Sequence, residues 1–320
     1  MASAGVLNRA TRNESRFAPM RSIVLALVVL ALAGCASFGP APTKVSGGLE
    51  CLGVKSDRPT VIFESGSFGG AADWSLVAEK LAVKGKVCAY DRDGLGRAAL
   101  HDLDRSPVAI AQRLGDLVAR EEGGAPVILV GHSNGGLYIE AFARLWPRRV
   151  AGLVLVDAVG TDVKDHPLAL ADLQAEERLS AFAPFARAVG LTHLEPLMDD
   201  ISPAAEAEAR RRQAWRRRES IEAGLLEERA FLKGLPAVDA LPALPPTIPV
   251  AVLIASRDPR SALMRDWRAA QVIPAQRACR SVVVDAWASH TSLLDAQRDY
   301  VVDLVGWLNG EQPWAGVTRC

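Results

Sequence analysis

The chain has 320 residues, of which 49% are hydrophobic and 23% are charged, and these values exclude a disordered or fibrous protein. Its 37 Lys and Arg residues equal its 37 Asp and Glu residues, so the formal net charge at pH 7 is zero. Since no basic excess favours a polyanion, we expect no nucleic-acid partner. The five histidines and five cysteines show no close metal-ligand spacing, and we therefore expect no metal site.

The N-terminus (residues 1–35) has the pattern of an export signal. Residues 23–33 are an uncharged apolar run, too short for a membrane-spanning helix of about 20 residues. Leu32-Ala33-Gly34-Cys35 resembles a bacterial lipobox, which implies lipidation of Cys35 and an exported cell-envelope lipoprotein whose domain lies on the periplasmic or extracellular side. The alternatives are a plain signal sequence and a buried apolar segment. Met20 is a candidate start, and residues 36–47 are expected to be a tether.

Beyond the tether, short apolar runs alternate with helical patterns, which indicates an α/β fold with a mostly parallel central sheet covered by helices. Strands are predicted over residues 49–54, 60–64, 86–91, 126–130, 150–156, 249–255 and 281–284. Helices are predicted over 74–83 (capped by Asp73), 107–122, 136–146, 261–270 and 293–308. The alternation of strand and helix patterns stops after residue 159 and returns at residue 247. Residues 160–246 are therefore expected to form a mostly helical lid inserted into a core of residues 48–159 and 247–310.

A nucleophile motif lies between an apolar strand and a helix. Gly131-His132-Ser133-Asn134-Gly135 follows the run 127–130 and precedes a helical stretch. In that context G-x-S-x-G predicts a sharp turn that lifts the serine hydroxyl out of the backbone, with glycines where side chains would collide. The helix N-terminus beyond Ser133 offers free N–H groups to a developing oxyanion. A purely structural turn is the alternative.

With these residues in place, the chain resembles the α/β-hydrolase fold over about residues 49–308. Glu64-Ser65-Gly66-Ser67 resembles the oxyanion loop of that fold, although Ser65-Gly66 replaces the usual His-Gly. Residues 89–97 resemble the Tyr-Asp-Arg-x-Gly-x-Gly segment, in which Arg92 is expected to pair with a carboxylate under the site and not to act in catalysis. The resemblance implies a serine esterase-like hydrolase.

The resemblance also implies a triad in the order Ser, acid, His. His290 is the histidine that lies between the last strand and the last helix, and it is the expected base, while His132 is expected to point away. Asp258 follows the strand 249–255 and is the expected acid, with Asp157 as the alternate. The backbone N–H groups of Asn134 and Ser67 are the expected oxyanion donors.

Four further cysteines allow three disulfide pairings, which the spacing does not decide: Cys51, Cys88, Cys279 and Cys320. An exported protein meets an oxidising compartment, where pairing is common. In the α/β-hydrolase fold the strands that carry Cys51 and Cys88 are neighbours, so the resemblance implies this pair.

The sequence therefore predicts a serine hydrolase that cleaves a carboxylic ester or related acyl bond of a small molecule through an acyl-enzyme. We expect no cofactor. The first alternative is an amide or peptide hydrolase of the aminopeptidase kind on the same triad, which acidic lid side chains facing the pocket would favour. The second is a non-catalytic, envelope-tethered binding lipoprotein. The sequence leaves the oligomeric state and the physiological substrate open.

Overall fold

The computed structural model describes residues 48–190, 205–256, 260–311, 317–318 and 320, all of which belong to the unit Pro42–Cys320. The predicted signal and tether, and Cys35 with them, lie outside the described residues. Asp258 also lies outside them.

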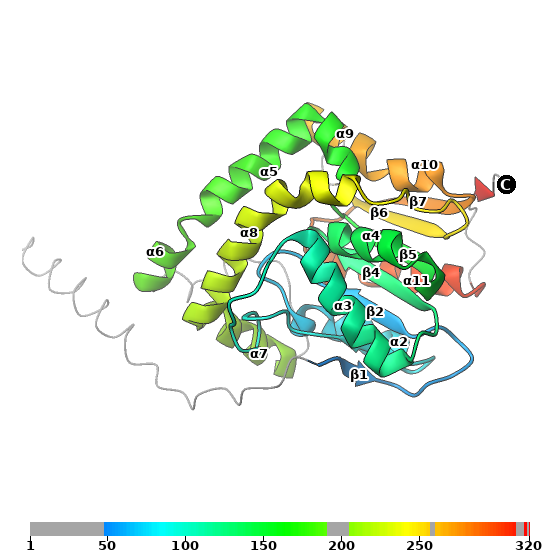
Figure 1. Ribbon diagram of the computed structural model, residues 1–320, viewed down its shortest axis with the longest axis horizontal. Coiled ribbons are helices and arrows are strands. Elements are labelled where there is room, and N and C mark those ends of the chain that lie inside the picture. The colour runs from blue at the N-terminus through cyan, green and yellow to red at the C-terminus, as the bar shows by residue number, and fades with distance from the viewer. Residues whose placement is uncertain (1–47, 191–204, 257–259, 312–316, 319) are drawn as a thin grey trace, which may run out of the picture. The chain divides into compact units, whose positions relative to one another are not determined.

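An eight-stranded sheet forms the centre of the fold, with the order β1-β3-β2-β4-β5-β6-β7-β8 (Figure 1). The six inner strands are parallel, and the edge strands β1 and β8 pair antiparallel with β3 and β7. The strands are β1 (Glu50–Leu52), β2 (Val61–Glu64), β3 (Val87–Ala89), β4 (Val127–His132), β5 (Val150–Val156), β6 (Val250–Ala255), β7 (Arg280–Ala286) and β8 (Val317–Thr318). The predicted fold class is confirmed.

Helices cover both faces of the sheet, which is why its central strands are apolar without a break. In β4, Val127 and Leu129 join one buried cluster, and Ile128 and Val130 join the other. The first cluster packs against α3 (Pro107–Glu122), α4 (Gly135–Leu145) and α10 (Ile273–Arg277). The second packs against α2 (Ser75–Ala82) and α11 (Asp299–Leu308). These layers hold the carboxyl ends of β2, β4 and β5 at one edge of the sheet.

Between β5 and β6 the described chain is helical. A short 3-10 turn (Thr161–Asp165) leads into α5 (Pro167–Ser180) and α6 (Ala183–Ala188), and α7 (Ala205–Arg216) and α8 (Arg218–Asp239) follow. Figure 1 shows α8 running from α7 alongside α5, and the two long helices are in contact. The helix α9 (Ala262–Gln271) then packs against α5. We call α5–α8 the cap.

Two local predictions differ from the structure. The stretch expected as one helix over 293–308 is a 3-10 turn (Ser292–Leu294) followed by α11, because Asp295 leaves helical geometry (φ −122°, ψ −96°). Asp73 is not the residue that precedes its helix. It lies in the 3-10 turn Ala71–Trp74, and its carboxylate accepts the backbone N–H of Gly70 at 3.0 Å.

Both cysteine pairs are joined. Cys51 on β1 and Cys88 on β3 stand opposite each other in the antiparallel register and form a disulfide, which confirms the implied pair. Cys279 and Cys320 form a second disulfide, which lies beside the β7–β8 edge. Each bond therefore fastens a short edge strand to the sheet.

We predict that peptide mapping under non-reducing conditions recovers Cys51 linked to Cys88. The double variant Cys51→Ser/Cys88→Ser should lose about 2–4 kcal/mol of unfolding free energy, because the crosslink lowers the conformational entropy of the unfolded chain. Denaturant titration measures this loss. Two free thiols at these positions in protein isolated without reductant would contradict the pairing.

Candidate active site

Ser133 occupies the turn from β4 into α4 in a left-handed backbone conformation (φ 54°). Its N–H donates to the Val156 carbonyl at 3.2 Å, and its own carbonyl accepts the N–H of Val159 at 3.0 Å. A Cβ at Gly135 would lie 2.5 Å from the Glu64 carbonyl oxygen, so only glycine fits there. A Cβ at Gly131 would likewise lie 2.8 Å from the Gly135 carbonyl oxygen, so the chain holds a strained serine between two glycine-enforced contacts, as the motif predicts.

His290 meets a carboxylate at one ring nitrogen. Its Nδ1 lies 2.6 Å from Oδ2 of Asp157, which follows β5. The other oxygen, Oδ1, accepts the N–H of Ala255 at 3.1 Å and the Gln271 amide at 3.0 Å. Asp157 is itself in a left-handed conformation (φ 43°). The carboxylate at this histidine is therefore the alternate acid, and it is held by contacts on both oxygens.

Opposing effects set the protonation of this pair. Burial raises the pKa of Asp157, but the hydrogen bond and charge of His290, together with the hydrogen bonds from Gln271 and Ala255, outweigh it, so the carboxyl pKa is lowered. Desolvation lowers the pKa of His290, but the hydrogen bond and charge of Asp157 prevail, so the ring pKa is raised above its ordinary value. The His290 side chain keeps 45% of its surface exposed, which leaves the ring open to a reacting partner.

A second histidine lies against the first, contrary to the expectation that His132 points away. The two rings are 4.4 Å apart between centroids, and Nε2 of His132 is 3.0 Å from the His290 carbonyl oxygen. Burial lowers the pKa of His132 to about 3, so the ring is neutral and Nε2–H donates. His132 therefore fixes the backbone of His290 beside the elbow.

The loop after β2 passes directly over the elbow. A Cβ at Gly66 would lie 2.8 Å from the Ser133 Cβ, so the loop and the serine are in contact. The Asn134 side-chain amide donates to the Ser67 hydroxyl at 2.6 Å. The structure thus brings together Ser67, Asn134 and Ser133, the residues expected to form an oxyanion site and its nucleophile.

Arg92 holds this loop from below, as its expected pairing with a carboxylate implies. Its Nη1 donates to Glu64 and to the Ser65 carbonyl, both at 2.7 Å, and its Nη2 donates to the Gly66 carbonyl at 2.8 Å. It also pairs with Glu227 of α8 at 2.9 Å. Desolvation lowers the pKa of Arg92, but the two carboxylates outweigh it and raise that pKa, so the guanidinium stays charged.

The cap contributes a residue that the sequence did not single out. Glu228 of α8 is buried, accepts the Asn134 amide at 3.1 Å and is hydrogen-bonded to Ser67. A Cβ at Gly224, one turn earlier, would lie 2.1 Å from the Phe68 ring. The cap helix therefore packs on the loop that lies over Ser133. An acidic pair one turn beyond a glycine is too common a pattern to have marked this helix.

Acidic side chains from the cap surround this edge of the site. Burial raises the pKa of Glu228, and the charges of Glu227 and Glu177 raise it further, against the hydrogen bond from Ser67. Burial and the charge of Asp172 likewise raise the pKa of Glu176, which interacts with His290. The cap thus presents negative charge toward the histidine and the serine turn.

A model of the alpha/beta hydrolase family matches residues 61–304, and the chain therefore belongs to that family. The match spans β2 to α11 and includes Ser133, Asp157 and His290. Among the described residues, no group of three or more His, Cys, Asp or Glu side chains is arranged to hold a metal ion.

Curated relatives share only part of the chain. The (lyso)-N-acylphosphatidylethanolamine lipase of Mus musculus is 30% identical over 109 residues, which are 33% of this chain and 32% of the lipase. The 1-acylglycerol-3-phosphate O-acyltransferase ABHD5 of Sus scrofa is 28% identical over 166 residues, 49% of this chain and 45% of the relative. The chain thus matches from about a third to less than half the length of these two relatives.

Solved structures share the fold over most of the chain. A Pseudomonas aeruginosa protein assigned as an epoxide hydrolase superposes with a TM-score of 0.61 and 19% identity, covering 84% of this chain and 95% of the other. A thermophilic esterase from Thermogutta terrifontis superposes with a TM-score of 0.55 and 20% identity, covering 83% and 93%. At these identities the likeness concerns the fold alone.

We predict that the His290 ring titrates above the ordinary value of 6.5 and that Asp157→Asn lowers its pKa, because the substitution removes the charge that stabilises the imidazolium. NMR titration of the ring protons measures both values. His132 should stay neutral down to about pH 3. The control is Asp258→Asn: if this variant, and not Asp157→Asn, lowers the His290 pKa, the acid lies after β6.

Proposed function

We propose that the protein is a serine hydrolase that cleaves a carboxylic ester or a related acyl bond of a small molecule. The observation that carries the proposal is the pairing of Asp157 with Nδ1 of His290, whose ring packs against that of His132, the residue before the strained Ser133. A nucleophilic serine needs a base, and the base needs an acid that fixes its tautomer and orientation. Membership of the alpha/beta hydrolase family supports a hydrolytic reaction.

The proposed reaction has two halves. Ser133 Oγ attacks the acyl carbonyl while Nε2 of His290 accepts its proton, and Asp157 stabilises the resulting imidazolium. The backbone N–H groups of Asn134 and Ser67 bind the oxyanion, which removes about 3–4 kcal/mol from the barrier per donor. His290 then protonates the leaving alcohol. In the second half it deprotonates a water molecule, which attacks the acyl-enzyme and releases the acid.

Asp157 takes the role of the acid in this proposal. Its position after β5 brings it to the histidine because β5 and β6 are parallel neighbours, and the N–H of Ala255 in β6 holds its second oxygen. Asp258, the acid favoured from the sequence, follows β6 and stays as the alternative. No metal or cofactor enters the reaction.

We predict that a fluorophosphonate probe labels the wild-type protein and that labelling and p-nitrophenyl ester turnover are lost in Ser133→Ala and His290→Ala. Asp157→Asn should lower kcat by about 10⁴, because the histidine then loses its tautomer and its counter-charge. Asp258→Asn serves as the matched control and should keep kcat within a few fold. A folded wild-type protein that is neither labelled nor active would favour the binding-protein alternative.

The activity should also follow the raised pKa of His290. The base must be neutral, so kcat/KM should fall as the pH decreases through that pKa and reach a plateau above it. Asp157→Asn should move the acidic limb of its residual activity to lower pH. A pH–rate profile of both proteins measures the shift, and an acidic limb at the same pH in both would contradict the role of Asp157.

A second candidate function is the hydrolysis of an aminoacyl amide or ester. The observation that favours it is the acidic cap, in which Glu228 lies against Asn134 and Glu176 interacts with His290. A carboxylate near an oxyanion site opposes the developing negative charge, unless a substrate ammonium lies between them. Burial raises the pKa of Glu228, and a substrate ammonium beside the carboxylate would lower that pKa again.

Aminoacyl and acetyl p-nitroanilides and esters separate the two functions. If the aminoacyl function holds, Glu228→Gln should lower kcat/KM for the aminoacyl substrates about 10–100-fold, because a charge-assisted contact contributes about 1.5–3 kcal/mol. The acetyl substrates should change little. The exposed Glu222 on the same helix provides the control variant Glu222→Gln. Equal losses for both substrate classes would contradict the aminoacyl function, and the ester function would then be the one supported.

We further propose that the protein is carried in the cell envelope by a lipid on Cys35. The support is the apolar run 23–33 followed by Leu32-Ala33-Gly34-Cys35. Among the described residues, no helix is both long and apolar enough to cross a membrane.

A further inference from the structure

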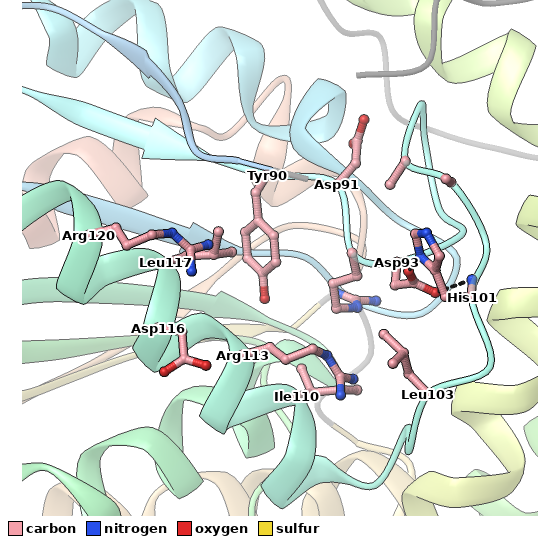
Figure 2. A pocket seen from close by; sticks show the side chains of 13 residues that line it. Tyr90, Asp91, Asp93, His101, Leu103, Ile110, Arg113, Asp116, Leu117 and Arg120 are labelled. Atoms are coloured by element: carbon pink, nitrogen blue, oxygen red, sulfur yellow. Dashed lines mark hydrogen bonds and ion pairs between the residues drawn. The ribbon is translucent and has the colours of Figure 1, made fainter. Parts of the chain in front are cut away.

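A cavity of about 610 Å³ lies between α3 and the loop that leaves β3, and Figure 2 shows its lining. One wall is the segment 90–93 with Ala98, Ala99, His101 and Leu103. The opposite wall is one face of α3 that carries five residues: Ile110, Arg113, Asp116, Leu117 and Arg120. The volume falls in the range of small-molecule sites, which is about 300–1,000 Å³.

The cavity is distinct from the site around the serine turn. Ser133, Asp157 and His290 are absent from its lining. The two places share Arg92, whose guanidinium binds the carbonyls of Ser65 and Gly66 on the serine side. The cavity therefore lies behind the residue that supports the loop over Ser133, and the proposed acyl transfer makes no use of it.

The carboxylates of the loop wall are already engaged. Asp91 accepts the backbone N–H groups of Ala71 and Arg97, each at 2.9 Å. Asp93 pairs with Arg105 at 2.7 Å and contacts the His101 ring. Their negative charge is thus directed toward partners in the protein. On the helix wall the two guanidinium groups, Arg113 and Arg120, outnumber the one carboxylate, Asp116.

Two guanidinium groups of α3 face the cavity without a hydrogen bond or ion pair to any described residue: Arg113, which is half-buried, and Arg120, which is exposed at the rim. They lie two helical turns apart, about 10 Å along the axis, with Leu117 between them. Figure 2 shows Arg113 extending from α3 toward the loop of Leu103, while the exposed Asp116 points away from that loop.

The remaining lining is apolar and suits a hydrocarbon body. Ile110 and Leu117 are buried side chains of α3, and Leu103 faces them from the loop with 42% of its surface exposed. A half-buried guanidinium next to an apolar wall binds an anion more tightly than one in water, because the contact is partly desolvated.

We propose that this cavity binds an amphiphilic organic anion, a carboxylate with a medium-length hydrocarbon chain. Arg113 holds the head group, Arg120 adds positive charge at the rim, and the chain lies against Leu103, Ile110 and Leu117. The proposal concerns binding at a second site and does not depend on the proposed hydrolase activity.

Octanoate is the probe, and octanol is its neutral counterpart. Isothermal titration calorimetry on the full-length chain should show octanoate binding at least 10-fold more tightly than octanol. Arg113→Gln should weaken octanoate roughly 10–100-fold, as the loss of one charge-assisted contact implies. Arg113→Lys should keep part of the affinity, and the exposed Arg148 provides the control Arg148→Gln, which should bind as the wild type does.

A diazirine-bearing octanoate then locates the site by peptide mapping. Label should fall on residues 98–120, and Arg113→Gln should remove it while the circular dichroism of the protein stays unchanged. Equal affinities for octanoate and octanol, undiminished binding by folded Arg113→Gln, or label confined to peptides around Ser133 would each overturn the proposal. If Arg113→Gln is not folded, the comparison of octanoate with octanol and the position of the label on the wild type decide alone.

Discussion

The buried Arg92 guanidinium is the contact on which the arrangement of the site depends. It joins two segments that are distant in sequence: residues 64–66, through the Glu64 carboxylate and the carbonyls of Ser65 and Gly66, and the cap helix α8, through Glu227. The side chains of Arg92, Glu64 and Glu227 are almost fully buried. Removing the cation would leave the buried Glu64 without its ion pair and Glu227 with the more distant Arg105 at 3.7 Å, and an unpaired charge in the interior is costly. The core, the loop over Ser133 and the cap are therefore coupled through one side chain.

Backbone strain is concentrated in the turns that follow β2, β4 and β5. Among the described residues, three that are not glycine have a positive φ: Phe68, Ser133 and Asp157. They lie in the loop after β2, after β4 and after β5, whose carboxyl ends meet at one edge of the sheet. Such conformations persist only where the surroundings fix them, and here tight contacts at Gly66, Gly135 and Gly224 do so. The parallel sheet thus brings the strained turns together, and the packing keeps them in place.

The sequence predicts the core well because its signals are local. Long apolar runs mark β4, β5 and β6 within a residue or two, and the Pro107 start of α3 follows from its helical spacing. Ser133 and His290 are also recognisable from their positions after a strand. The break after Ser292–Leu294 was missed because the conformation of one residue, Asp295, interrupts a pattern that is otherwise helical.

By itself, the sequence determined the alternation of core strands and helices and the strand-to-helix turn at Ser133, since each depends on neighbouring residues. Only the tertiary structure showed that Asp157 reaches His290, because the two residues are 133 positions apart and meet through the pairing of β5, β6 and β7. The same holds for Glu228, which contacts Asn134 across 94 residues once α8 packs on the loop. Contacts of this range depend on how the layers assemble, and no local pattern of residues records them.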